Sequence, residues 1–286
     1  TEIWEKALGR DHPTVATVLN NRAVLLESQG KYDEADRLYL RAIEIGEKTL
    51  GPDHPGLATP LNNRAGLLES QGKYDEADPL YLRAIEIGEK TLGPDHPILA
   101  TRLNNRAVLL EKQGKYEEAA SLYKRCQAIK EKVYGPEHPS LATTLNNRAG
   151  LLKSQGKYDE ADPLYARVLQ ILAATVGEEH PNYASALNNR AELLKAQGKY
   201  AEAEPLHARA TEIWEKALSP EHPLVATALN NLAGLLKAQG KVNEARSLLE
   251  RALAIFRKSL GEGHPHTTIV LDSLRKLDEG QVEGSE

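Results

Sequence analysis

Apolar residues recur along this chain with the period of a helix, and the pattern comes in pairs of runs. The first run of residues 56–97 has apolar positions spaced by three and four residues, which predicts a helix with one buried side. These positions are Ala58, Leu61, Ala65 and Leu68. A second run extends from Tyr74 to about Leu92. We call the predicted helix over residues 57–70 helix A and the one that starts at Tyr74 helix B.

A short turn separates the two predicted helices. Gln71-Gly72-Lys73 lies between them, and Gly supplies the positive φ that a helix exit needs. A turn of three residues makes the helices an antiparallel hairpin. Neither helix has enough apolar surface to be stable alone, so the sequence predicts that hairpins stack.

The hairpin is repeated along the chain with a period of 42 residues, marked by the dipeptide His-Pro. The His residues are His12, His54, His96, His138, His180, His222 and His264. We expect six complete hairpins, at 14–55, 56–97, 98–139, 140–181, 182–223 and 224–265. Residues 1–13 nearly duplicate 211–223 and are expected to be part of a helix B from a truncated preceding repeat. We expect 266–277 to form a capping helix and 278–286 a disordered tail, and the chain, which lacks Met, to be a piece of a longer array.

The positions of eight residues in the unit resemble the signature of the tetratricopeptide repeat. They are Leu61, Ala65, Leu68, Gly72, Tyr74, Ala77, Tyr81 and Ala84. With its 42-residue length and its Leu-Asn-Asn and Gln-Gly-Lys-Tyr segments, the unit is similar to the repeats of kinesin light chains and nephrocystin-type proteins. The resemblance implies an all-α, right-handed superhelical solenoid. It also implies a scaffold that binds a protein or an extended peptide in a concave groove lined by helices A.

Composition limits the kinds of binding partner and the cellular compartment that we expect. The net charge of −5 with both signs evenly mixed argues against nucleic acid, which demands a basic face. No apolar run approaches the ~18 residues of a membrane span. A single Cys cannot form an internal disulfide and fits a reducing compartment, so we expect a cytoplasmic protein. The sequence indicates no oligomeric state.

The chemistry-bearing residues favour structural roles, and we expect no enzyme, cofactor or metal. The seven repeated His residues cannot share a metal ion, since stacked helices lie ~8–10 Å apart and zinc ligands ~2 Å from the ion. Each His precedes a Pro suited to the first turn of helix A, and we expect it to cap that helix or contact the loop. Cys126 stands where other repeats have Ala or Val, and His207 where they have Tyr, so both are expected in the core.

The polar side of helix A supplies the candidate binding residues, because the resembling family lines its groove with these positions. The first Asn of each pair is expected to bind a peptide backbone, with a hydrogen bond to the neighbouring helix as the structural alternative. These are Asn20, Asn62, Asn104, Asn146, Asn188 and Asn230. Seven residues further along each helix, the charge changes sign from Glu27, Glu69 and Glu111 to Lys153, Lys195 and Lys237. We therefore expect a ligand with basic residues toward the first repeats and acidic residues toward the last. The alternative is a solvated face of mixed charge.

The same helices carry an arginine on their buried side, where a guanidinium needs a partner. An acidic residue follows fourteen positions later in four repeats, which predicts ion pairs between helices A and B of one hairpin. The expected pairs are Arg22/Asp36, Arg64/Asp78, Arg148/Asp162 and Arg190/Glu204, and Arg106 faces Ala120.

Two other classes of protein remain open beside a peptide-binding scaffold. The chain could be the cargo-adaptor subunit of a motor, as in the kinesin light chains it resembles, or the recognition arm of a regulatory protein with a nucleotide switch. A coiled-coil heptad segment in the flanking sequence would indicate the first, and a Gly-rich phosphate loop the second. A purely structural spacer is a further alternative.

Overall fold

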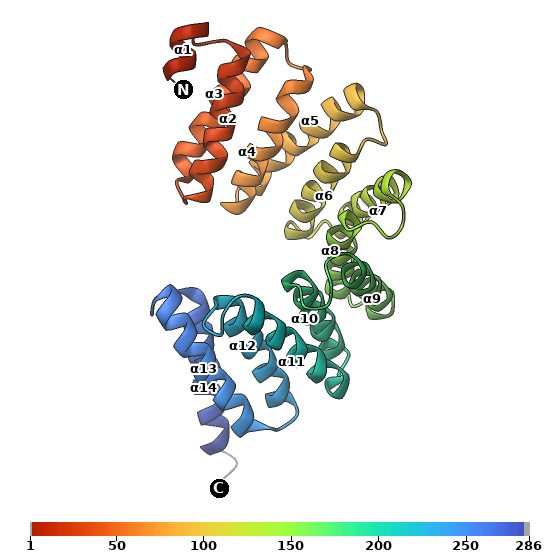
Figure 1. The fold of residues 1–286 in the computed structure, drawn as a ribbon, viewed down its shortest axis with the longest axis vertical. Helices are drawn as coiled ribbons and strands as arrows, with labels where there is room; N and C mark the ends of the chain where they lie inside the picture. Colours follow the sequence, from red (N-terminus) through yellow and green to blue (C-terminus); the bar gives the residue numbers. More distant parts are fainter. Residues whose placement is uncertain (1, 283–286) are drawn as a thin grey trace. The chain divides into compact units, whose positions relative to one another are not determined.

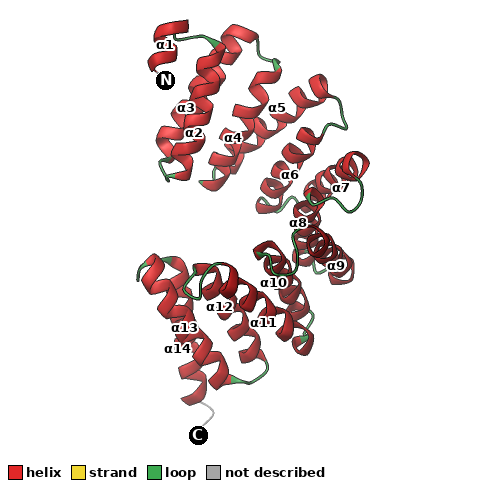
Figure 2. Ribbon diagram, in the orientation of Figure 1, coloured by secondary structure: helices red, strands yellow, loops and turns green. Residues whose placement is uncertain are grey.

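The computed structural model describes residues 2–282, and the described part of the chain contains helices without a strand (Figure 2). The elements are α1 (Glu2–Leu8), α2 (Pro13–Ser28), α3 (Tyr32–Leu50), η1 (Pro55–Leu57), α4 (Ala58–Ser70), α5 (Tyr74–Leu92), α6 (Pro97–Lys112), α7 (Tyr116–Tyr134), α8 (Ser140–Ser154), α9 (Tyr158–Thr175), α10 (Pro181–Ala196), α11 (Tyr200–Ala217), α12 (Pro223–Ala238), α13 (Val242–Leu260) and α14 (Pro265–Val282). The predicted all-α class is confirmed. For residues 56–97 the predicted helix A corresponds to η1 with α4, and the predicted helix B to α5.

The chain divides into two compact units, residues 1–147 and 148–286, and each unit is a stack of helical hairpins. In the first unit α2 packs on α3, α4 on α5 and α6 on α7 (Figure 1). In the second unit α10 packs on α11 and α12 on α13, and α14 covers α13. The tetratricopeptide-type solenoid predicted from the sequence is therefore the fold of both units.

Each helix A begins at a histidine that caps it. In all seven His-Pro dipeptides the imidazole Nδ1 accepts a hydrogen bond, 3.1 or 3.2 Å long, from the backbone N–H two residues later. The donors belong to Thr14, Gly56, Ile98, Ser140, Asn182, Leu224 and His266. A cap satisfies a backbone donor that the helix itself leaves without a partner. The expected capping role of the His-Pro dipeptide is confirmed.

The second hairpin starts differently from the others, with the 3₁₀ turn η1 before α4. Its cause is Pro60, which has no N–H and therefore cannot donate to the carbonyl of Gly56 four residues earlier. The turn between α4 and α5 contains Gly72 with φ of 75°, as the sequence predicted.

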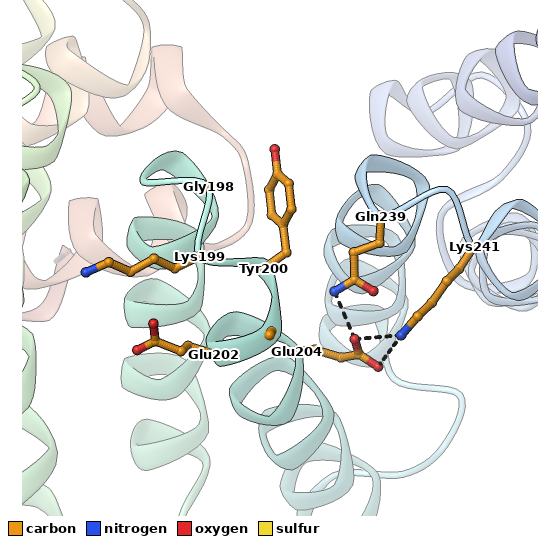
Figure 3. Close-up of a pocket in the computed structure, with 8 residues that line it drawn as sticks. Gly198, Lys199, Tyr200, Glu202, Glu204, Gln239 and Lys241 are labelled. Atoms are coloured by element: carbon orange, nitrogen blue, oxygen red, sulfur yellow. Dashed lines mark hydrogen bonds and ion pairs between the residues drawn. The ribbon is translucent and has the colours of Figure 1, made fainter.

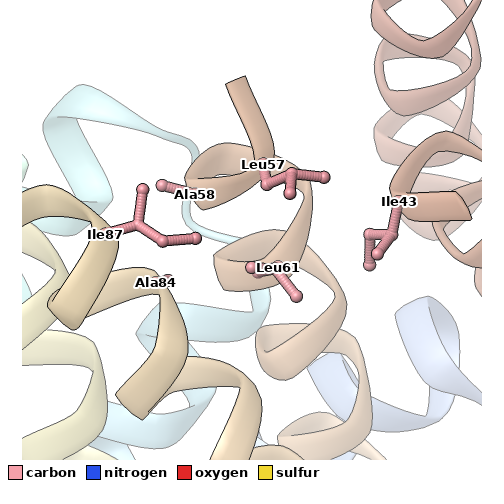
Figure 4. Packing of buried hydrophobic residues seen from close by; sticks show 6 residues of the cluster. All are labelled: Ile43, Leu57, Ala58, Leu61, Ala84 and Ile87. Carbon is pink, nitrogen blue, oxygen red and sulfur yellow. The ribbon is translucent and has the colours of Figure 1, made fainter. Parts of the chain in front are cut away.

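The core lies both within and between hairpins, because a helix A inside a unit, such as α4 or α12, is packed between two helices B. In the second repeat Leu57 and Leu61 of the helix-A segment contact Ile43 of the preceding α3 and Ala84 and Ile87 of its own α5 (Figure 4). All five side chains are buried. Helix A therefore gains its apolar contacts from two neighbouring repeats at once.

A leucine in the last turns of helix A carries much of the contact between repeats. Leu67 packs against Ala23, Leu26 and Tyr39 of the preceding hairpin and has no exposed surface. The equivalent leucines of later repeats also join the core of the hairpin before them; they are Leu109, Leu193 and Leu235. Leu25, with no complete hairpin before it, is 57% exposed. Burial of a leucine is worth ~1.5–3 kcal/mol, so the stacking of hairpins stabilises each of them.

The arginine pairs predicted within one hairpin are wrong for Arg64 and Arg190, because these two, like Arg106, bond to the preceding hairpin instead. Their Nε atoms donate to acidic side chains 28 residues earlier, at 2.8 Å in each case. The pairs are Arg64–Asp36, Arg106–Asp78 and Arg190–Asp162. Arg22 is exposed, and Glu204 is bound by Gln239 and Lys241. The helical period places an arginine on the buried side but does not decide which of two flanking helices B it meets.

The ends of the chain are helical as far as they are described. Residues Glu2–Leu8 form α1, within the segment expected to be part of a helix B. At the other end α14 continues to Val282, so the disordered tail expected from Asp278 onward is wrong for its first residues. The remainder of that expected tail, residues 283–286, lies outside the described residues. Arg246 of α13 bonds to Asp278 in this continued part of α14.

The cross-repeat arginine pairs can be tested by a double-mutant cycle. Arg64→Ala and Asp36→Ala should couple by about 1 kcal/mol in the free energy of unfolding, since their side chains are only 17% and 27% exposed. Arg64→Ala and Asp78→Ala, the pair predicted from the sequence, should be additive. Urea unfolding followed by circular dichroism measures both cycles. Coupling of Arg64 to Asp78 rather than to Asp36 would contradict the pairing.

Candidate functional site

The surface formed by helices A of the first unit contains the candidate site. A hollow of about 500 Å³ lies over α2, α4 and α6. We call it the Gly66 hollow, and it is lined by Val24, Glu27, Ser28, Tyr32, Tyr39, Asn62, Asn63, Gly66, Ser70, Tyr81 and Asn105. A second hollow of about 310 Å³ continues it and adds Glu69, Val108 and Lys112. Three residues named from the sequence, Glu27, Asn62 and Glu69, are therefore brought together on one surface.

The absence of a side chain at Gly66 opens this hollow. A Cβ atom built there would meet only the Tyr81 hydroxyl, at 3.5 Å. The repeats on either side carry Val24 and Val108 at the same position. The alternation of Val and Gly therefore produces a depression between two flanking side chains, with room for a ligand group.

Tyrosine hydroxyls of helix B hold the glutamates in the floor of this surface. Tyr39 donates to Glu27 and Tyr81 to Glu69, both at 2.9 Å. Tyr123 donates to Glu111 at 3.3 Å. Burial raises the pKa of each tyrosine well above its ordinary value, and the adjacent carboxylate adds to the shift. The hydroxyls are therefore fixed donors, and the first unit has an acidic surface of ordered carboxylates.

The glutamates differ in their remaining partners. Lys112 donates to Glu69 at 2.8 Å, whereas among the described residues Glu27 forms no ion pair. Burial raises the pKa of Glu111 above its ordinary value, and the hydrogen bond from Tyr123 opposes part of that shift. Glu27 is thus the carboxylate of this surface that remains open to a cationic ligand.

The asparagines bind one another between repeats, which was the structural alternative at the sequence level. The second Asn of one repeat donates through Nδ2 to Oδ1 of the first Asn in the preceding repeat, at 3.2 or 3.3 Å. The pairs are Asn63–Asn20, Asn105–Asn62, Asn147–Asn104 and Asn231–Asn188. These oxygens are already engaged in stacking the repeats, and contact of the asparagines with a ligand stays a prediction.

In the second unit the basic positions are partly neutralised. Lys195 lies 3.4 Å from Glu192 of the same helix, and the buried His207 places its Nε2 3.1 Å from the same carboxylate. Burial alone would raise the pKa of Glu192, but His207 and Lys195 together bring it below its ordinary value. Lys153 is half-buried and Lys237 exposed. The change of charge expected from the sequence is therefore weaker at Lys195 than at the other two lysines.

A second-unit hollow of about 550 Å³ lies at the turns that connect α10 to α11 and α12 to α13 (Figure 3). Glu204 accepts hydrogen bonds there from Gln239 and Lys241, each 2.9 Å long. The bond from Lys241 is the main reason why the pKa of Glu204 is lowered. Since these groups already satisfy one another, this hollow is a weaker candidate than the Gly66 hollow.

Two buried cations escaped the sequence analysis. Arg102 is 6% exposed and donates to the Ala84 carbonyl at 3.2 Å. Lys130 is 9% exposed and donates to the Ser140 carbonyl and to Thr144, beside the buried thiol of Cys126. Comparison of the repeats position by position could have found both, because Arg102 aligns with Pro60 and Lys130 with Gly88. His207 and Cys126 are buried, as expected.

The described residues include no group of three His, Cys, Asp or Glu side chains placed to hold a metal ion. Within residues 2–282, no helix has the length and apolar character needed to cross a membrane. The residues that come together on the helix-A surface are hydrogen-bonding and charged groups, spread over several repeats rather than converging in a closed cleft.

A stack of helical hairpins with an open polar surface defines a class of helical repeat scaffold. The family model of the tetratricopeptide repeat matches residues 1–48, 14–87, 56–132, 103–174, 140–216, 182–258 and 224–274. The chain therefore belongs to the tetratricopeptide repeat family. Membership supports a protein-interaction scaffold as its general class. No curated protein matches the chain.

Solved structures with the same fold include proteins related to kinesin light chains. A Podosopora anserina protein with nearly identical TPR-like repeats, of the kinesin light chain type, is 27% identical with a TM-score of 0.63, covering 72% of this chain and 98% of that chain. BtubC (BKLC) from P. vanneervenii is 23% identical with a TM-score of 0.68, covering 82% and 94%. PilF of Pseudomonas aeruginosa is 17% identical with a TM-score of 0.58, covering 93% and 99%. The similarity to kinesin light chain-type repeats found in the sequence is confirmed.

Glu111 and Glu192, whose pKa values are shifted in opposite directions, can be distinguished by titration. Glu111 should titrate at a higher pH than Glu192 when their side-chain carboxyl carbons are followed by NMR, with Glu111→Gln and Glu192→Gln for assignment. Glu111 then contributes stability below its unfolded-state pKa that is lost as the pH rises through the folded one. Glu192 contributes stability above its unfolded-state pKa that is lost as the pH falls through the folded one. The reverse order of titration would contradict the burial argument.

Proposed function

We propose that this protein is a scaffold that binds an extended peptide or a partner protein on its helix-A surface. The Gly66 hollow is the observation that carries the proposal, because it combines open space with ordered polar groups on the face that stacking leaves uncovered. A binding site needs a few fixed polar groups in a concave surface, and the tyrosine-held glutamates meet that requirement. Family membership and the kinesin light chain-type neighbours support the general class.

The charges of the first unit favour a ligand with basic residues. Glu27 is open to a cation, Glu111 adds negative charge on the same face, and Glu69 contributes less because Lys112 offsets it. In the second unit Lys153 and Lys237 favour acidic residues, and Lys195 contributes less because Glu192 offsets it. Complementary charge gives specificity and association rate more than raw affinity. The asparagines Asn20, Asn62, Asn104, Asn146, Asn188 and Asn230 keep a secondary role in this proposal, as contacts to the peptide backbone.

A motor cargo adaptor is the second candidate, favoured by the similarity to a kinesin light chain-type structure. It is one way of using the same surface, since an adaptor also holds a partner. Cytoplasmic location stays part of the proposal, in keeping with the buried free thiol of Cys126.

The role of Glu27 can be tested by giving it the residue found at the same position of the fourth repeat, Lys153. Glu27→Lys should lower the affinity for lysine-rich peptides, selected beforehand on the wild-type protein, by about tenfold. The same variant should reduce the loss of affinity with added salt, because exposed charges are screened within ~8–10 Å at physiological ionic strength. Fluorescence anisotropy with labelled peptides measures both effects.

Glu34→Lys is the matched control, since it makes the same change of charge at an exposed position in the first turn of α3, outside the Gly66 hollow. It should leave peptide binding within about twofold of wild type. Equal weakening by both variants would mean that net charge rather than the helix-A surface attracts the peptide, and would contradict the proposal.

A further inference from the structure

The contact between consecutive repeats includes one position where helix B faces the next helix A, and its composition changes along the chain. The two facing residues are always fourteen positions apart. The pairs are Gly46/Pro60, Gly88/Arg102, Lys130/Thr144, Leu172/Ala186, Trp214/Ala228 and Phe256/Val270. In the second to fifth pairs one residue is long or bulky and the other is small, and in the sixth Phe256 is paired with Val270. Only Gly46/Pro60 has no large side chain on either helix.

Where Gly88 leaves space, Arg102 fills it. A Cβ at Gly88 would lie 2.7 Å from the Arg102 guanidinium, so the two residues occupy one site. In the next repeat the roles are exchanged, and the Lys130 ammonium bonds to Thr144 and to the Ser140 carbonyl. Both cations reach the gap between repeats from opposite helices.

In the second unit the positions that align with Gly46 carry buried apolar side chains. Leu172, Trp214 and Phe256 are each at most 7% exposed, and Phe256 stacks on His266 with ring centroids 5.4 Å apart. The site therefore accepts aliphatic and aromatic groups as well as cations, and the fold around it stays the same.

At Gly46/Pro60 the Leu57 side chain takes the space beside Gly46, where a Cβ atom would lie 2.6 Å from its Cδ2, and neither Gly46 nor Pro60 supplies a long side chain to fill the rest. A gap of about 290 Å³ lies between α2, α3 and α4. Its apolar lining includes Ala42, Leu50, Leu57 and Pro60, and Thr17 and Asn20 line it from the polar side of α2. The volume is near the lower end for ligand pockets, large enough for one side chain rather than a whole small molecule.

We propose that this gap binds an aromatic or large aliphatic side chain of the peptide ligand. The inference rests on the proposed function and names the ligand more closely. The occupant is indicated by the chain itself, which has the buried side chains Leu172, Trp214 and Phe256 at the positions that align with Gly46. A ligand side chain of the same kind would find the contacts that those residues find in the second unit.

Charge complementarity indicates what accompanies this apolar anchor. Asn20, at the edge of the gap, and Glu27, in the Gly66 hollow, both lie on α2. Seven residues of helix span about 10 Å at ~1.5 Å per residue. An extended peptide advances ~3.3 Å per residue, so its Lys or Arg would follow or precede the anchor by about two to four positions. The ligand is therefore a segment with one large apolar residue and one basic residue at that spacing.

The test is a selection from a random peptide library displayed on phage, with the whole chain as target. Enriched sequences should combine a large apolar residue with Lys or Arg two to four positions away. Synthetic copies of these sequences then serve as probes in fluorescence anisotropy against four variants. Circular dichroism and thermal unfolding establish first that each variant is folded.

The variants fill the gap from Pro60, the position that aligns with Arg102 of the next repeat. Pro60→Arg fills it with a cationic side chain, and Pro60→Leu fills it with a neutral one. The neutral variant removes the effect of added charge, and both fillings should weaken binding about tenfold or more. Pro60→Ala leaves the gap open and should bind as wild type. Glu27→Lys should weaken binding through the basic residue.

Peptides that lack the apolar residue, or that bind the Pro60→Leu variant as tightly as wild type, would overturn the inference about the gap. If those peptides still lose affinity on Glu27→Lys, the proposed function stands without it. If no sequence is enriched, or the bound peptides are indifferent to every variant, the helix-A surface is not a peptide site and both proposals fail.

Discussion

The burial of helix A between two helices B inside each unit is the constraint on which the rest of this structure depends. Leu57 and Leu61 contact α3 and α5 together, and Leu67 packs entirely against the hairpin before it. Arginine–carboxylate pairs and asparagine pairs join the same neighbours. A hairpin removed from its neighbours would expose these leucines and leave these polar groups without partners. Stability is therefore a property of interfaces between repeats, as expected for a one-dimensional array.

This constraint also explains which surface is available for function. The apolar side of helix A is used twice, once by each neighbouring helix B, so only its polar side remains for a ligand. On that side the near-identical repeats provide a regular set of groups, and differences between repeats provide the particular features. Gly66 opens a hollow that valines close in the adjacent repeats, and Gly46 with Pro60 leaves a gap that other pairs fill.

The sequence could predict the elements because their periodicity is local. Tyr74–Leu92 was expected as a helix and forms α5, and the His-Pro caps follow from backbone chemistry within two residues. It could not predict the partner of Arg64. Asp36 lies on the helix B before it and Asp78 on the helix B after it, and only the stacking of hairpins decides which of the two meets the guanidinium. The same holds for Asn62. The sequence predicts its place on the helix, but it does not predict the hydrogen bond that Asn62 accepts from Asn105 of the next repeat. Arg102 was missed because its burial depends on the missing side chain at Gly88.

If stability resides in the interfaces between hairpins, the free energy of unfolding must depend on the number of repeats in the chain. The hairpin 56–97, the pair 56–139 and residues 14–139 contain one, two and three repeats of the first unit, and urea unfolding can be followed for each by circular dichroism. We expect the single hairpin to be largely unfolded. Each added repeat should raise the free energy of unfolding by several kcal/mol, because it buries one further interface. A single hairpin that is fully helical and as resistant to urea as the three-repeat chain would contradict this expectation.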